Sequence, residues 1–274
     1  LYSNSPLEDT EAVLKANHTL TFQTPKLSFF LPETAPFVSN FDVLEIGLDI
    51  EFLQTTEPIG QLISKLEAQR FYKPREKFDH KGTYGHALIV SGSYGKIGAA
   101  VLSTTSAFRI GAGMVTAYVP KCGYAIIQTT IPEAMVITDK EEDYLSDISF
   151  DFEPSAIGIG MGIGKNESTV AALKKILQNK GIPFVIDADA LNILSKNKAL
   201  LKLLPKNSVL TPHPGELKRL IGEWKNDFEK LEKTKKFSEK YEVVIIIKGA
   251  YTITVYGDNL YINTTGNPGM GTAG

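Results

Sequence analysis

Short apolar runs alternate with stretches of helical spacing along most of this chain. Uninterrupted runs rich in Val, Ile and Leu are typical of strands buried on both faces of a sheet. The stretches between them repeat apolar residues every three or four positions, which is typical of amphipathic helices. We expect strands at 87–90, 115–119, 156–160, 183–186, 208–210 and 243–247, helices at 99–110, 169–178 and 226–241, and a closing hairpin at 252–263. This alternation predicts an α/β fold, a doubly wound, mostly parallel sheet with helices on both faces.

The first residues follow a different pattern. Strand-like runs at 19–22, 26–31 and 41–46 are separated by Pro, Gly and Asn, and the segment is too small for a core of its own. We therefore expect residues 1–54 to be the tail of a second, upstream α/β domain. Residues 55–274 form the main domain, which should begin with a helix over 59–70. The chain stops inside a glycine turn at Gly271–Gly274, so we expect this domain to continue further.

Composition narrows the class of protein. The hydrophobic fraction of 43% and the charged fraction of 22% are ordinary for a soluble globular enzyme. A formal net charge of −2 gives no reason to expect nucleic acid as a partner. No apolar run approaches the roughly 18 residues of a membrane span, and no signal peptide is visible, so we expect no membrane contact and a cytoplasmic location. The single cysteine, Cys122, excludes an intramolecular disulfide.

A glycine-rich turn follows the strand at 87–90. Gly92, Gly95 and Gly98 precede a helix start, and amides at such a turn and helix end attract anions. A Walker A loop is excluded because the two Gly-Lys pairs, at 95–96 and 164–165, lack the following Ser or Thr. A dinucleotide turn is excluded because the next strand ends in Pro-Lys rather than an acid. The turn predicts a phosphorylated small-molecule ligand; a tight connection with no ligand is the alternative.

Unusual residues follow five of the predicted strands. Ligands of doubly wound sheets bind beyond the carboxyl ends of strands, where the strand order reverses. The motifs at these ends are Gly92–Gly98, Gly158–Gly164, Asp187 with Asp189, Pro212–Glu216 and Lys248–Thr252. Their convergence predicts one ligand cleft at this edge of the sheet.

Four side chains at these ends are candidate ligand contacts. His213 lies between two prolines; a helix start explains the neighbouring proline and Glu216 but leaves the imidazole for a ligand. Asp189 is expected to cap the following helix. Asp187 could bind Mg²⁺, form a hydrogen bond with a sugar hydroxyl or cap the helix, and the sequence does not decide between these roles. Lys248 is placed to bind a phosphate or the edge of a nucleotide. The alternative is a structural lysine whose aliphatic stem covers apolar surface while its charge stays in water.

In this order the motifs resemble the NAD(P)H-hydrate dehydratases, members of the ribokinase-like superfamily, over residues 73–274. The matching pieces are Lys81–His86, Gly92–Ala100, Arg109–Thr116, Pro132–Met135, Asp187–Leu191, Leu210–Glu216, Lys248–Ala250 and Asn267–Met270. Residues 11–48, above all 16–28, resemble the closing segment of an NAD(P)H-hydrate epimerase domain, which precedes the dehydratase in bifunctional bacterial enzymes.

The resemblance implies repair of hydrated nicotinamide cofactors. ADP or ATP, with Mg²⁺, would phosphorylate the added hydroxyl, and loss of phosphate would restore NADH or NADPH. The upstream domain would exchange the R and S hydrates and hold K⁺. By motif, Ala99, Gly162 and His213 should touch the hydrate. The adenine nucleotide should be held by Lys248, Gly249, Ala250, Tyr251, Thr252 and Gly274. The family's basic Asp would lie beyond Gly274. We also expect a homo-oligomer.

Two other functions compete with this interpretation. A ribokinase-like kinase of a small alcohol would share the nucleotide site but release a phosphorylated product. A non-catalytic nucleotide-sensing module would fit a domain that lacks the expected Asp.

Overall fold

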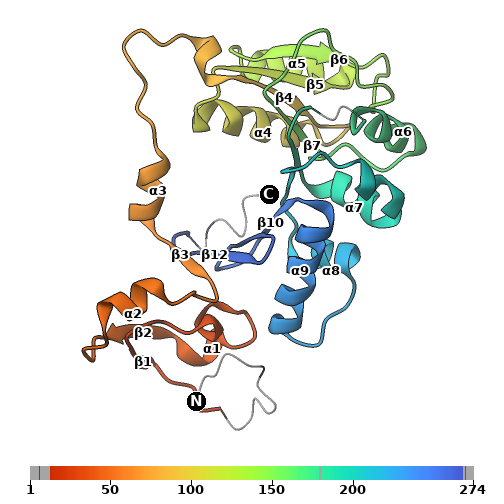
Figure 1. Ribbon diagram of the computed structural model, residues 1–274. Helices are drawn as coiled ribbons and strands as arrows, with labels where there is room; N and C mark the ends of the chain where they lie inside the picture. The colour runs from red at the N-terminus through yellow and green to blue at the C-terminus, as the bar shows by residue number, and fades with distance from the viewer. Residues whose placement is uncertain (1–5, 7–12, 179–180, 268, 270–274) are drawn as a thin grey trace.

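The computed structural model describes residue 6, residues 13–178, 181–267 and residue 269. Its main element is a ten-stranded sheet (Figure 1). The strand order is β3 (Gln61–Ile63), β12 (Asn259–Asn263), β11 (Ile253–Tyr256), β10 (Val244–Ile247), β9 (Val209–Leu210), β8 (Phe184–Ile186), β7 (Ala156–Ile159), β4 (His86–Val90), β5 (Met114–Val119) and β6 (Met135–Thr138). Within this sheet β11 is antiparallel to both neighbours, and the other pairings are parallel. The expected mostly parallel sheet is confirmed.

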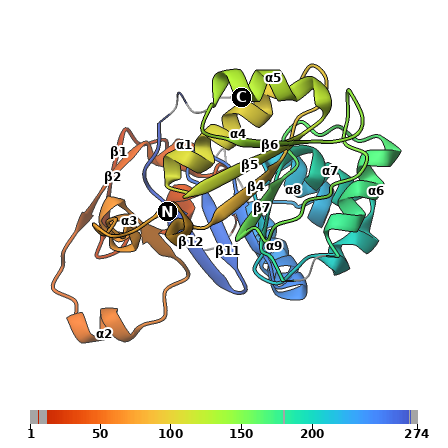
Figure 2. The same cartoon turned by 90° about the horizontal axis from the view of Figure 1, so that it is seen from above.

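Helices cover both faces of the sheet, as expected for a doubly wound fold (Figure 2). On one face lie α4 (Ile97–Ile110) and α5 (Tyr124–Thr130). On the other face lie α6 (Glu167–Ile176), α7 (Ala188–Lys196), α8 (Pro214–Ile221) and α9 (Asp227–Tyr241). Alternate residues of β5 serve the two layers: Ala117 and Val119 are buried with Ile97 and Ile127, whereas Tyr118 belongs to the larger core under α6–α9.

The N-terminal segment forms a small unit that packs against the main domain (Figure 1). Its strands, β1 (His18–Phe22) and β2 (Asn40–Leu44), pair in parallel, and α1 (Ala35–Val38) and α2 (Ile50–Thr55) accompany them. The strand expected at 26–31 is wrong: Leu27–Phe30 is a 3-10 helical turn. Phe29, Phe30 and Leu31 are all buried in the main core, whereas a strand would turn alternate side chains outward.

The helix expected over 59–70 is wrong in its first half. Leu62 and Ile63 lie in β3, which pairs with β12, and α3 (Lys65–Phe71) begins only afterwards. Ser64 sets that start, because it forms a capping box with Glu67. The division at 54/55 stays a prediction; it falls one residue before the end of α2.

Within the described ranges, we find no helix that combines the length and the apolar character needed to cross a membrane.

A buried carboxylate organises the chain after β6. Asp139 is 1% exposed and accepts hydrogen bonds from the backbone N–H groups of Glu141, Ser146 and Asp147, at 2.8–3.0 Å. The Ser146 hydroxyl donates a fourth, at 2.8 Å. Burial raises the pKa of Asp139, but these hydrogen bonds outweigh it and leave the pKa below its usual value.

Asp139→Asn should therefore reduce stability in a pH-dependent way. A carboxyl whose pKa is lower in the folded state stabilises that state above its unfolded pKa, near 4, and the contribution is lost as pH falls through the folded pKa. We expect a loss of about 2 kcal/mol at neutral pH, because an amide NH₂ would face N–H donors. The difference should shrink below about pH 4. Urea unfolding at pH 7 and pH 3 measures this; a difference that persists at pH 3 would contradict it.

Candidate functional site

The five motif-bearing strand ends lie at one edge of the sheet. Strands β4, β7, β8, β9 and β10 are consecutive neighbours and all run parallel. The segments that follow them therefore form a continuous rim, which spans about 19 Å at the usual ~4.8 Å between neighbouring strands. This confirms the expectation that Lys248–Thr252 lies on the same rim as Gly92–Gly98.

The two glycine turns meet where the strand order reverses, between β4 and β7. The N–H of Gly92 donates to the carbonyl of Met161 at 2.9 Å, and the Ser93 hydroxyl donates to the carbonyl of Gly162 at 2.7 Å. Gly162 has φ +70°, and a Cβ built there would lie 3.2 Å from the Ala99 Cβ. The structure thus brings together Ala99 and Gly162, two residues expected to touch the hydrate.

The N-terminus of α4 opens at the same point. Its N-cap residue, Lys96, makes no side-chain capping hydrogen bond, so the first-turn amides of the helix are not capped by that side chain. A helix of 14 residues that starts beside two glycine turns is suited to an anion. The phosphate groups of a nucleotide are the matching chemistry.

Gly162→Ala should damage this region, with Gly164→Ala as its matched control. Both glycines have φ near +70 to +80°, so each alanine costs roughly 1–2 kcal/mol of backbone strain. Only at Gly162 does the added Cβ also meet neighbours, the Cβ atoms of Lys96 and Ala99 at 3.1 and 3.2 Å; at Gly164 nothing lies within 4 Å. We expect Gly162→Ala alone to raise the KM for the hydrate that the sequence resemblance implies, by about tenfold, because it displaces the start of α4. Equal kinetics for the two variants would contradict this.

The structure decides between the roles that the sequence left to the two aspartates after β8. Asp187, not Asp189, is the N-cap of α7, and it accepts from the N–H of Ala188 at 2.8 Å. Asp189 instead accepts from the N–H of Gly164 at 3.0 Å, so the predicted cap at Asp189 is wrong. The reason is tertiary: Asp189 lies in the first turn of α7, and it faces the glycine turn that follows the neighbouring strand β7.

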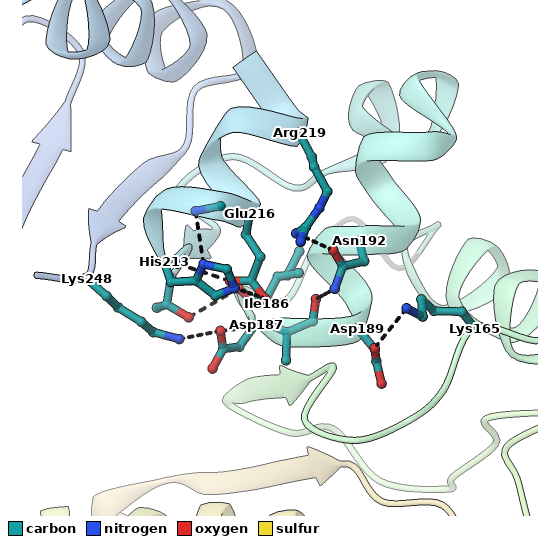
Figure 3. A network of polar contacts seen from close by, with 12 residues as sticks. Lys165, Ile186, Asp187, Asp189, Asn192, His213, Glu216, Arg219 and Lys248 are labelled. Carbon is teal, nitrogen blue, oxygen red and sulfur yellow. Dashed lines mark hydrogen bonds and ion pairs between the residues drawn. The ribbon is translucent and has the colours of Figure 1, made fainter. Parts of the chain in front are cut away.

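Two lysines accompany Asp189. The Nζ atoms of Lys96 and Lys165 lie 3.6 and 4.0 Å from its carboxylate oxygens. Figure 3 shows Lys165 reaching toward Asp189 from the neighbouring turn. In the sequence both lysines belong to Gly-Lys pairs, which exclude a Walker A loop but do not by themselves predict a contact with Asp189. Their position at two strand ends was the available signal that they belong to the rim.

His213 is the N-cap of α8 as well as a rim residue. Its ring Nδ1 accepts a hydrogen bond from the backbone N–H of Gly215 at 3.0 Å. The backbone N–H of His213 donates to Glu216 Oε2 at 3.0 Å. Glu216 Oε1 lies 3.5 Å from Nε2. The idea that a helix start leaves the imidazole uninvolved is therefore wrong. Because Nδ1 accepts, the proton is assigned to Nε2, which lies on the side of Glu216, and 52% of the His213 side chain is exposed.

Lys248 pairs with Asp187 across the intervening strand β9. Its Nζ lies 2.6 Å from Asp187 Oδ1, and the two side chains are 45% and 24% exposed. Figure 3 shows His213 beside this pair. Sequence reasoning placed both residues on the rim but missed their contact, which joins positions 61 apart. The expected nucleotide residue Gly274 lies outside the described residues.

The described residues contain no group of three or more His, Cys, Asp or Glu side chains placed to hold a metal. Mg²⁺ commonly binds through substrate phosphates and one or two carboxylates rather than a protein cage. Asp187 is a rim carboxylate that fits such a role.

The main sheet and its covering helices have a ribokinase-like α/β fold. A ribokinase-like protein from Enterococcus faecalis superimposes with a TM-score of 0.68 over 80% of this chain and 76% of that one, at 24% identity, which supports the fold. The chain belongs to the NAD(P)H-hydrate dehydratase family, whose model matches residues 87–274.

Relatives with this family's names cover most of the chain. The bifunctional NAD(P)H-hydrate repair enzyme of Moorella thermoacetica is 35% identical over 95% of this chain and 51% of its own length. The ADP-dependent (S)-NAD(P)H-hydrate dehydratase of Neisseria meningitidis is 33% identical over 78% of this chain and 72% of its own. The ADP/ATP-dependent dehydratase of Bacillus subtilis, co-crystallised with ATP/Mg²⁺, is 28% identical with a TM-score of 0.64 over 76% of this chain and 74% of its own. The chain spans about half the length of its bifunctional relatives.

Proposed function

We propose that this chain dehydrates (S)-NAD(P)H-hydrate at the expense of ADP or ATP and so returns NADH or NADPH to use. The observation that carries the proposal is the single rim that holds both expected subsites. Ala99 and Gly162 lie close together at its β4–β7 end, and Lys248–Thr252 follows β10 at its other end.

In the proposed reaction the hydroxyl oxygen of the hydrate attacks the terminal phosphorus of the nucleotide. A carboxylate takes the hydroxyl proton, and the P–O bond to the departing ADP or AMP breaks. The C–O bond then breaks with release of phosphate, and the adjacent ring carbon loses a proton, which restores the double bond. The carboxylate would be the basic Asp that the family resemblance implies.

The rim residues would bind and orient the two substrates. The start of α4, which has no side-chain cap, would supply amides for phosphate oxygens, and Lys248 would add a positive charge near the nucleotide. Mg²⁺, when bound with the nucleotide, would neutralise phosphate charge, and Asp187 is the carboxylate placed to approach it. His213 would donate from Nε2 to the ring or carboxamide of the hydrate.

The rest of the expected assembly belongs to the same proposal. Residues 1–54 would close an upstream epimerase domain that exchanges the R and S hydrates and holds K⁺. The complete protein would be a cytoplasmic homo-oligomer.

The test is to incubate the complete protein with Mg²⁺, ADP or ATP and purified (S)-NADH-hydrate. Recovery of the absorbance of the reduced ring, with one phosphate released per ring restored, supports the dehydratase. A stable phosphorylated product would indicate a kinase instead. Nucleotide binding without any turnover would indicate a sensing module. Repeating the assay with the R hydrate tests the epimerase.

A further inference from the structure

The N-terminal segment touches the residues expected to hold the adenine nucleotide. Phe30, in the 3-10 turn, is 2% exposed. Its ring meets the ring of Tyr251 in a T-shaped arrangement, with centroids 5.1 Å apart and planes at 89°. Tyr251 is the fourth residue of Lys248–Thr252. The two rings join positions that lie more than 200 residues apart in the chain.

Phe30 is held firmly behind this contact. The ring of Phe41 packs edge-on against it at 5.8 Å, and Phe41 also packs on Phe29 at 5.2 Å. Phe30 shares one core with Ile247 and Ile253, the apolar residues that immediately precede and follow the nucleotide segment. The turn therefore belongs to the structure that supports both ends of that segment.

A polar contact attaches the segment just after this turn to α9. The N–H of Glu33 donates to Asp227 Oδ2 at 2.9 Å, and the N–H of Asp227 donates back to Glu33 Oε2 at 3.0 Å. Asp227 also forms a buried ion pair with Lys230, in which the side chains are 9% and 5% exposed. Removing one partner of a buried pair is costly, so this contact gives the turn a defined position against α9.

The nucleotide segment has little internal support of its own. Gly249 and Ala250 are exposed, and the hydrogen bond from the Thr252 hydroxyl to the carbonyl of Gly249 is long, at 3.4 Å. Tyr251 is half-buried, and its side chain attaches the segment to the main core by packing against it.

We infer that Phe30 is a positioning residue for the adenine nucleotide. Its ring holds Tyr251, and thereby the backbone of Lys248–Thr252, in the conformation that the nucleotide needs, which lowers the ordering cost of binding. The inference rests on the proposed function of this segment. If residues 1–54 close the upstream domain, the ring pair links the tail of one domain to the nucleotide site of the other.

The test is isothermal titration of the complete protein with Mg²⁺-ADP, comparing Phe30→Leu with Phe237→Leu. Phe237 offers a matched control, because it is also buried, at 9% exposure, and pairs with Tyr241 at 4.6 Å within α9. Both variants should lower Tm. Only Phe30→Leu should weaken ADP binding, about 3- to 10-fold, the scale of one aromatic pair, and raise the KM for ADP while kcat stays nearly constant. Equal ADP affinity in the two variants would overturn the inference.

A double-mutant cycle shows whether the effect passes through Tyr251. Tyr251→Leu should weaken ADP about as much as Phe30→Leu, and the double variant should bind no worse than Tyr251→Leu alone. Strictly additive losses would overturn the inference. Lys248→Ala separates the two hypotheses. Unchanged ADP affinity in that variant refutes the nucleotide assignment and the inference with it. A loss there without a loss in Phe30→Leu refutes the positioning role alone.

Discussion

Lys248→Ala should weaken the binding of ADP and ATP about 10- to 100-fold. The substitution removes a charge-assisted contact to phosphate, worth about 1.5–3 kcal/mol, at a rate of about 1.4 kcal/mol per tenfold change. It also leaves the carboxylate of Asp187 without its positively charged partner, since Asp187 Oδ1 lies 2.6 Å from the lysine Nζ. An unpaired carboxylate on the rim would repel phosphate oxygens. Titration of the complete protein with each nucleotide measures the loss.

Two further variants make this result specific. Lys206→Ala breaks a comparable surface pair, since its Nζ lies 2.7 Å from Glu242 Oε1, and it should leave nucleotide affinity unchanged. In titrations without Mg²⁺, where Asp187 has no ion to approach, adding Asp187→Asn to Lys248→Ala removes the unpaired charge and should recover part of the affinity. Nucleotide affinity that is the same in Lys248→Ala and Lys206→Ala would show that Lys248 is a structural lysine.

His213→Ala should slow turnover of the hydrate about 10- to 100-fold, the scale of one or two good hydrogen bonds. The geometry changes what we expect for stability. From the sequence, folding should be nearly unaffected, but the Nδ1 hydrogen bond to Gly215 makes His213 the cap of α8. Losing a cap costs about 1 kcal/mol, so His213→Ala should also lower Tm by a few degrees.

His213→Asn separates the cap from the ligand contact. Asparagine is a good N-cap, so this variant should keep most of the stability of α8. It lacks the imidazole Nε2, so its turnover should remain as low as that of His213→Ala. Kinetic assays and thermal unfolding of both variants in the complete protein provide the comparison. Turnover restored by asparagine would mean that His213 acts only through the helix.

Local patterns were sufficient for the elements around the rim. Each buried strand of the rim is a short apolar run, and each is followed within two residues by glycine, proline or a charged residue. The strand expected at 87–90 is β4, and the helix expected at 226–241 is α9 with a difference of one residue. The pattern failed at 26–31 and 59–70, where the conformation depends on the main core and on β12.

The side chains of the rim show the same limit. The sequence placed Asp187, His213 and Lys248 at strand ends, because a residue's position after a strand is a local property. It misassigned the cap to Asp189 and missed the second role of His213. Which aspartate caps α7 depends on the turn after the neighbouring strand, where Gly164 donates its N–H to Asp189.

The sequence by itself determined the alternating α/β pattern, the five motif-bearing strand ends and the family. Only the tertiary structure decided that these ends are consecutive neighbours, that Lys248 pairs with Asp187 and that Phe30 packs on Tyr251. Strands and turns follow from short-range spacing and backbone preferences, which can be read within a few residues. Contacts between positions 61 or more apart depend on strand order and on how the layers pack, and no local pattern carries that information.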